Sequence, residues 1–327
     1  MVKYIVKRLL LFIPTLFVMT IVIFIFMHAI PGDIIDALQA EPGNEEIDRA
    51  ALEKFMGLDV PLIVQYGRWI GIIRNIDGEY KGILNGYLGY SWIKKVSVNR
   101  LFRTSWAMTL ELSIIGFVVS IFLAIPIGIY SATKQGKIGD ILSRSFAIFC
   151  ISVPSFWLAT MIIVYPAIWW GYTPPLMVVR FRDAPIDNLK MFIIPGILLG
   201  MQFCGMIMRI TRTKMLDVLR QDYIRTARSK GLSQKIILVR HALKNALILV
   251  ITLIGQNIPF LIGGTIIIEE IFSIPGMGRL LINAFRSRDN ELTGGIILFY
   301  TIIVLIVNLI VDLSYSYINP KIRYESK

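Results

Sequence analysis

Cysteine, histidine and charged side chains are all scarce in this 327-residue sequence, and each scarcity argues against a class of protein. The chain holds two cysteines, two histidines and 17% charged residues. Cys150 and Cys204 both lie inside apolar runs, so we expect buried thiols rather than a disulfide or a metal pair. His28 and His241 stand at no ligand spacing from any cysteine or carboxylate, so we expect no metal site.

Motifs for catalysis are also missing. No phosphate-binding loop of the form G-x-x-x-x-G-K-[ST] occurs, and the pair Gly136-Lys137 is not followed by Ser or Thr. No Ser/His/Asp, Cys/His or paired-carboxylate arrangement stands out. We therefore expect no catalytic residue, no ATP hydrolysis and no cofactor in this chain.

Apolar residues are abundant, at 55% of the chain with a mean hydropathy of +0.67, which is typical of an integral membrane protein. A helix of about 20 apolar residues crosses a bilayer. Six such windows predict an all-α protein with six transmembrane helices, at residues 9–30, 108–130, 146–170, 191–208, 246–268 and 295–318. The first window is longer than a signal-peptide core and lacks a cleavage site after Ile30, which favours an uncleaved anchor. In the fourth, Gly196, Gly200 and Gly205 indicate close packing against a neighbouring helix.

The distribution of Lys and Arg predicts the orientation, because basic residues near span ends are retained in the cytoplasm. With both termini inside, all inside segments are basic, whereas residues 31–105 hold nine basic and ten acidic residues. The net charge of +12 is therefore mainly a topology signal, and nucleic-acid binding is disfavoured because aromatics are not interleaved with the basic residues. We expect a multi-pass cell-membrane protein with four parts: residues 1–30, an extracytoplasmic subdomain at 31–105, a five-helix core at 106–318 with a cytoplasmic loop at 209–244, and a cytoplasmic tail at 319–327.

Residues 31–105 carry signals for two helices. Asn44 is placed to cap the first, with Glu45 and Glu46 in its first turn, and Gly57 is placed to end it. The second is predicted over residues 62–73, with an apolar face of Ile63, Tyr66, Ile70 and Ile73. These helices are expected to pack on each other, to lie at the membrane interface or to contact a soluble partner, and the sequence leaves these alternatives open.

The most unusual part of the chain is residues 209–244, called the basic segment below, which places ten Lys or Arg against two Asp between apolar runs. Asp222 is predicted to cap a short helix that Gly231 ends, and Ser233 to cap a second helix from Gln234 to about Asn245. Two capped helices on one basic loop predict a surface that docks another protein.

Polar and helix-weakening residues interrupt several spans, where they are tolerated mainly against protein or a watery cavity. Candidates for lining a translocation path are Ser152, Ser155, Gln202, Gln256, Asn257 and Gly263. The alternative is that such residues join helices to one another. Glu111 and Asp312 are ionisable groups at membrane depth, each close enough to a span end to reach water.

Together these segments resemble the transmembrane permease subunits of bacterial and archaeal ABC importers, in the dipeptide, oligopeptide and nickel branch. The likeness covers nearly the whole chain and rests on the order of several short motifs: Pro31-Gly32-Asp33, Gly57-Leu58-Asp59-Val60-Pro61 with Gln65-Tyr66 and Trp69, Leu88-Gly89-Tyr90-Ser91, Thr109-Leu110-Glu111-Leu112, residues 222–231 with 240–245, and Ser273-Ile274-Pro275-Gly276-Met277-Gly278. Arg225, Thr226 and Ala227 occupy the positions of the family's E-A-A triplet, followed by Gly231. Because Arg replaces the usual Glu, a glutamate salt bridge to the ATPase cannot be assumed.

The resemblance implies an ABC type I importer permease fold and alternating access. It implies a heterodimer with a homologous permease, two ATP-binding subunits that hold ATP and Mg²⁺, and an extracytoplasmic binding protein that delivers cargo. The ATPase-coupling residues would be Asp222, Tyr223, Arg225, Thr226, Ala227, Lys230 and Gly231. Di- or oligopeptides are the favoured substrate, with nickel or another small solute as the alternative. A gradient-driven secondary transporter is disfavoured, because neither inverted repeats nor further intramembrane charge are evident.

Overall fold

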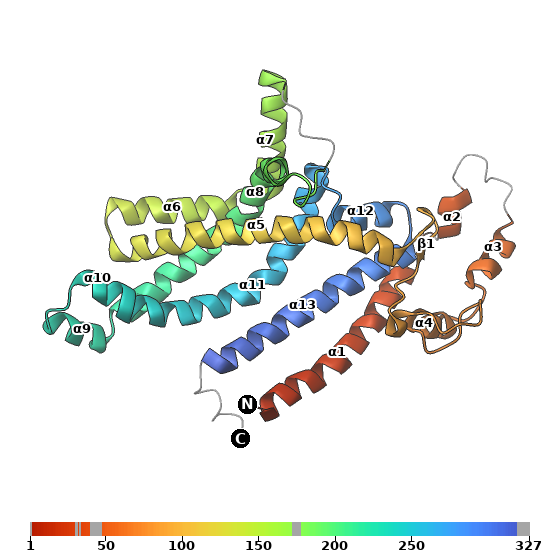
Figure 1. Cartoon of the computed structure of the whole chain (residues 1–327), viewed down its shortest axis with the longest axis horizontal. Helices are drawn as coiled ribbons and strands as arrows, with labels where there is room; N and C mark the ends of the chain where they lie inside the picture. The colour runs from red at the N-terminus through yellow and green to blue at the C-terminus, as the bar shows by residue number, and fades with distance from the viewer. Residues whose placement is uncertain (1, 30–31, 33, 40–47, 172–177, 319–327) are drawn as a thin grey trace. The chain divides into compact units, whose positions relative to one another are not determined.

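The computed structural model describes residues 2–29, 32, 34–39, 48–171 and 178–318. They form two compact units, which we describe separately. Figure 1 labels most of their helices and colours the chain from its N-terminus to its C-terminus. Unit 1 comprises residues 109–274 and the chain from residue 307, and unit 2 comprises residues 2–108 and 275–306. The described residues are overwhelmingly helical, which confirms the all-α fold class. The four-part division expected from the sequence stays a prediction.

Among the described residues, five helices are long and apolar enough to cross a membrane. They lie within α1 (Val2–Ala29), α5 (Val98–Thr133), α8 (Pro185–Leu219), α11 (Lys244–Ile271) and α13 (Asn290–Ile318). The sixth expected span is a pair of helices, α6 (Ile138–Ser152) and α7 (Ser155–Trp170), bent by 88°. Six spans result if this pair counts as one. The sequence placed an interruption inside the window at 146–170, and the helix breaks there. It did not predict that the bend would be so large or that the first helix would begin at Ile138.

Pro154 explains the break between α6 and α7. It has no backbone N–H to continue a helix, and its ring disfavours the helical conformation of the preceding residue. Val153 is accordingly extended, with φ −84° and ψ 121°, and Ser155 begins the next helix. The α6–α7 pair thus changes direction where the sequence placed an interruption.

In unit 1, α8 packs against α5, α6 and α11, and glycines allow the close approaches. A Cβ atom on Gly200 would lie 2.5 Å from the carbonyl oxygen of Gly116 on α5, and one on Gly196 would lie 2.4 Å from the Ile115 side chain. A Cβ atom on Gly205 would lie 2.7 Å from the carbonyl oxygen of Ala147 on α6. The prediction that these three glycines pack against neighbouring helices is confirmed.

The basic segment of unit 1 continues α8 and contains α9 (Asp222–Ser229), α10 (Gln234–Ile236) and η2 (Ile237–Leu243), the last with π-helical hydrogen bonding. From η2 the chain enters α11 directly. Four consecutive elements of this unit are therefore linked by very short connections.

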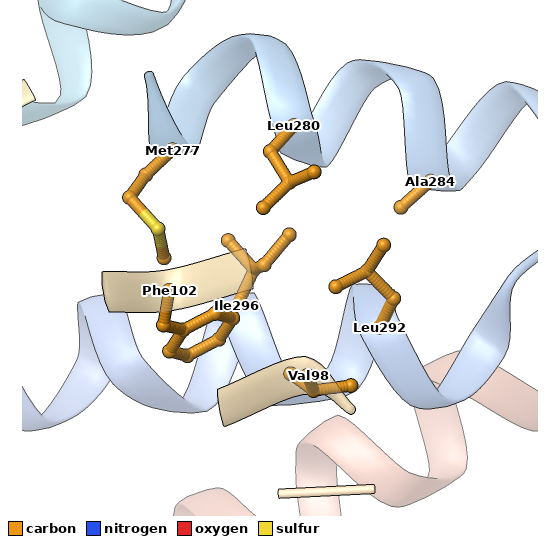
Figure 2. Packing of buried hydrophobic residues seen from close by; sticks show 7 residues of the cluster. All are labelled: Val98, Phe102, Met277, Leu280, Ala284, Leu292 and Ile296. Carbon is orange, nitrogen blue, oxygen red and sulfur yellow. The ribbon is translucent and has the colours of Figure 1, made fainter. Parts of the chain in front are cut away.

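Unit 2 contains α1, α2 (Ile34–Gln39), α3 (Arg49–Met56), α4 (Leu62–Ile70), η1 (Ile83–Asn85), α12 (Met277–Arg286) and the first parts of α5 and α13. A two-stranded antiparallel sheet, β1 (Tyr90–Ser91) with β2 (Val96–Ser97), was not expected. One core cluster joins α5, α12 and α13 (Figure 2), with buried side chains of Val98, Phe102, Met277, Leu280, Ala284, Leu292 and Ile296. A second joins Ile23 and Met27 of α1 to Leu298 of α13.

Two helix boundaries in residues 31–105 differ from those expected. Asn44 lies outside the described residues, and the N-cap of α3 is Asp48, whose carboxylate accepts a hydrogen bond from the Ala50 amide. Gly57 ends α3 in the left-handed conformation, as expected. The helix predicted over 62–73 ends at Ile70, because Gly71 also adopts a left-handed conformation. Ile73 is therefore not part of its face.

Candidate functional site

The short helix α9 is the part of the basic segment most suited to docking. Gln221 is its N-cap residue and Asp222 is its first helical residue, so the expectation that Asp222 caps the helix is wrong. The Asp222 carboxylate lies in the first turn, where the helix dipole favours negative charge. Its Oδ1 atom is 3.4 Å from Nη1 of Arg225. At the other end Gly231 has φ +75°, and its amide donates to the carbonyl oxygen of Arg228, which confirms its predicted position.

The two faces of α9 differ sharply. Ile224, which was not predicted to couple, and Ala227, which was, are both buried. The remaining predicted coupling residues are exposed: Asp222, Tyr223, Arg225, Thr226, Lys230 and Gly231. The buried pair belongs to a cluster with Ala132 of α5, Met215 of α8, Ile237 and Ala242 of η2, and Ala246 of α11. One face of α9 is therefore fixed to four other elements, and the opposite face is free to meet a partner.

The second helix of the basic segment differs from the expectation. Ser233 is at the N-cap position, but its side chain makes no capping hydrogen bond, and the helix does not stop near Asn245. It passes through η2 into α11 because Ala242 and Ala246 continue one buried face. The Asn245 side-chain amide donates to the Tyr223 hydroxyl at 2.9 Å and to the His241 carbonyl at 3.0 Å. This bond ties α9 to the first turn of α11.

An ion pair that sequence patterns did not predict lies near this cluster. Arg212 of α8 donates two hydrogen bonds, from Nε at 2.7 Å and Nη2 at 2.9 Å, to the buried carboxylate of Asp140 on α6. The Ser131 hydroxyl of α5 and the Gly136 amide donate to the same carboxylate. Such a bidentate arrangement is geometrically specific, so it fixes the ends of three helices relative to one another. The two residues are 72 positions apart, so local sequence patterns could not predict that they pair.

The six candidate path residues lie on four helices or at their ends. Ser152 and Ser155 flank the α6–α7 bend, Gln202 is half-buried on α8, and Gln256, Asn257 and Gly263 are on α11. No hydrogen bond among the described residues joins one of the six to another.

On α11, four exposed residues follow the spacing of one helical face: Gln256, Phe260, Gly263 and Ile267. Asn257 lies beside this face, half-buried, and donates to the carbonyl oxygen of Leu253 in its own helix. The structure therefore brings Gln256 and Gly263 onto one surface and assigns Asn257 a local bond.

One buried acidic residue, Glu269, lies just outside the apolar windows identified in the sequence. Glu269 of α11 is fully buried and accepts a hydrogen bond of 2.7 Å from the Thr109 hydroxyl of α5. The fifth apolar window ended at Ile268, one residue before Glu269, so the sequence reasoning did not consider this carboxylate. Glu111 is half-buried on α5, and Asp312 is half-buried on α13. Cys150 and Cys204 are buried free thiols, as expected.

Comparison with known proteins gives a consistent result. Residues 124–324 match the family described as binding-protein-dependent transport system inner membrane component, and residues 1–113 match its N-terminal region. The chain is 34% identical to a putative peptide transport system permease protein of Brucella abortus, covering 99% of this chain and 100% of the relative. It is 35% identical to the dipeptide transport system permease protein DppB of Escherichia coli K12, with the same coverage. It is 32% identical to the glutathione transport system permease protein GsiC of Salmonella paratyphi A.

Among solved structures, an amino acid ABC transporter crystallised with histidines matches 67% of this chain and 94% of its own chain, with a TM-score of 0.51 and 14% identity. This likeness supports the fold alone.

The matched families consist of membrane components of transport systems. They confirm the family resemblance stated from the sequence, and they confirm the expectation that this chain takes part in transport rather than catalysis. A membrane location and a complex with other subunits follow from the same membership. The chain belongs to the family of inner membrane permease components of binding-protein-dependent transport systems.

Proposed function

We propose that this chain forms one half of the translocation path of an ATP-driven importer for di- or oligopeptides. A homologous permease would supply the other half, two ATP-binding subunits the energy, and an extracytoplasmic binding protein the cargo. The observation that carries the coupling role is the two-sided geometry of α9, with Ile224 and Ala227 buried and a charged face exposed.

In this proposal the exposed face of α9 docks into an ATP-binding subunit, which holds ATP and Mg²⁺. Closure of the ATP-binding subunits would push α9 as a rigid element, because its buried face belongs to the same cluster as α5, α8 and η2. The bond between Tyr223 and Asn245 offers a direct link into α11. Coupling needs an element with two defined positions, and a helix fixed on one face is suited to that role.

The proposed orientation places the basic segment and both termini in the cytoplasm, as the positive charge near the span ends favours. Residues 31–105 then face the opposite side, where a binding protein would deliver cargo. On α11, the face with Gln256 and Gly263 is the best candidate for the path, because it is exposed in this chain and carries a polar side chain at membrane depth. Ser152, Ser155 and Gln202 remain candidates on other helices.

Peptides are the favoured cargo because the names of relatives at 34% and 35% identity refer to peptide and dipeptide transport. Glutathione, in the name of a third relative, is itself a tripeptide. Nickel, the alternative raised from the sequence, finds no support in these names.

The test is uptake of a labelled dipeptide into vesicles that contain the complete transporter with its binding protein. We expect ATP-dependent uptake that disappears when the ATP-binding subunits are omitted. Uptake by this chain alone, driven by an ion gradient, would contradict the proposal. Competition by other peptides but not by Ni²⁺ is expected, and the reverse pattern would overturn the substrate class.

A further inference from the structure

The short helix α4 of unit 2 packs against the Ala29 end of the membrane helix α1. The hydroxyl groups of Thr20 and Tyr66 are 2.9 Å apart, and His28 Nε2 lies 3.2 Å from Gln65 Oε1. The ring of Phe24 is 5.2 Å from that of Tyr66 between centroids. Since residues 8–29 form a candidate membrane span, these contacts place α4 at the depth of one leaflet or its interface.

The first turn of α4, beside α1, carries apolar and exposed side chains. Leu62 is 55% exposed and Ile63 is 77% exposed. Together with Ile21 and Ile25 of α1 they line an almost wholly apolar groove of about 530 Å³. Exposed aliphatic side chains next to a membrane helix meet acyl chains rather than water.

A second, more polar hollow of about 380 Å³ adjoins this groove, since Phe24 and His28 line both. Arg68 of α4 lies in its wall. Arg68 Nε is buried and has no hydrogen-bond partner among the described residues, and Nη1 makes only a long contact of 3.5 Å with the Gly57 carbonyl. A buried N–H donor without an acceptor costs free energy, and an anionic group beside Nε would satisfy it.

The other charged groups that line this hollow are already engaged. Glu53 pairs with Arg49, and Lys81 pairs with Asp77 and Glu79.

Two further carboxylates line it as well. Glu291 accepts a hydrogen bond from the Tyr90 amide, and Asp289 accepts one from the Ser91 hydroxyl. Burial raises the pKa of Asp289, which lowers the share of negative charge that it presents. Arg68 Nε is thus a buried donor in the wall for which the described residues supply no acceptor.

From this arrangement we propose that α1 and α4 form a binding site for an anionic phospholipid. One acyl chain lies in the groove along Ile25, Leu62 and Ile63, and the phosphate reaches Arg68 in the adjoining hollow. A phospholipid fits both hollows at once, because it joins an apolar tail to an anionic headgroup at the interface depth. A soluble anion would leave the apolar groove empty, and a protein chain would need an acidic side chain at the membrane surface.

Native mass spectrometry of the full-length chain in detergent, titrated with phosphatidylglycerol or phosphatidylcholine, tests this site. We expect wild-type protein to bind one phosphatidylglycerol in preference to phosphatidylcholine. Arg68→Gln should weaken the phosphatidylglycerol complex about tenfold or more, as expected for loss of a charge-assisted contact. Arg68→Lys, which keeps the charge, should retain part of the preference and guards against an effect of misfolding. Ile63→Ser should weaken binding of both lipids.

Arg74→Gln is the matched control, because Arg74 belongs to the same unit, stacks on Tyr80 and does not line either hollow. It should leave lipid binding unchanged. Equal binding of both lipids by wild type, or an Arg74 effect as large as that of Arg68, would overturn the proposal. So would equally tight Arg68-dependent binding of glycerol phosphate or of a dipeptide, which would identify a soluble anion. Loss of the Arg68-dependent lipid in the assembled transporter would mean that another protein chain covers the groove, and would also overturn it.

Discussion

At the scale of single residues, Gly231 combines a left-handed backbone conformation, which other residues rarely adopt, with open surroundings. Its φ is +75°, and a Cβ atom there would meet no atom of this chain within 4 Å. Gly231→Val should therefore cost the chain only about 1–2 kcal/mol through backbone strain. We expect it to abolish uptake while the protein stays in the membrane, because the added side chain would occupy the space proposed for an ATP-binding subunit.

Two controls separate strain from docking in that experiment. Gly171 at the end of α7 also has a positive φ and open surroundings, so Gly171→Val carries comparable strain elsewhere. Gly231→Asn keeps a residue that tolerates the left-handed conformation. Gly171→Val should support uptake in proportion to its membrane level. Gly231→Asn should lose uptake as well, because its side chain fills the same docking space with less backbone strain. Normal uptake by Gly231→Val would remove the coupling role from this end of α9.

The Asp140–Arg212 pair gives a second prediction at this scale. Arg212→Gln leaves the carboxylate of Asp140 buried, 1% exposed, without its main partner. Breaking a buried pair on one side costs about 3–5 kcal/mol. We expect a clearly lower thermal unfolding temperature in detergent, whereas Arg209→Gln, which removes an exposed cation of the same helix, should change it little. Equal unfolding temperatures for both variants would show that the pair does not fix α6 against α8.

At the scale of elements, α9 is held by its buried face rather than by its own length. A helix this short is unstable in water without tertiary packing. Ile224→Ala removes a fully buried side chain and should cost about 2–5 kcal/mol locally. Hydrogen exchange of the amides at residues 222–229 should rise markedly.

Ile236→Ala is the matched control for that variant, since Ile236 has the same side chain, lies in the same segment and is exposed. Its exchange rates should stay close to those of wild type. If both variants exchange alike, the packing of Ile224 does not hold α9 in place.

Sequence patterns predicted the ends of short helices better than the way one helix continues into the next. Gly231 and Gly57 were placed correctly because a left-handed conformation at a helix end strongly favours glycine. Asp222 was assigned one position wrongly, because an Asp fits both the N-cap and the first turn. The passage of η2 into α11 depends on burial of Ala242 and Ala246 against other helices, which local sequence does not encode.

At the scale of the whole molecule, composition and motif order were sufficient for the membrane class and the family. Long-range pairs were not predictable: Thr20 meets Tyr66 across 46 residues, and Arg212 meets Asp140 across 72. Single-sequence patterns report local periodicity, and these contacts depend on how helices pack. The candidate coupling helix was therefore found from the sequence, whereas its fixed face and the adjoining ion pair required the structure.

The central claim is that the exposed face of α9 meets an ATP-binding subunit. Site-specific cross-linking in the assembled transporter, from a cysteine in Thr226→Cys, tests it most directly, since Cys150 and Cys204 are buried. We predict a cross-link to the ATP-binding subunit from this position, and none from Asn85→Cys in unit 2, where the side chain is also exposed. Absence of the Thr226 cross-link in a transporter that still imports peptide with ATP would contradict the account.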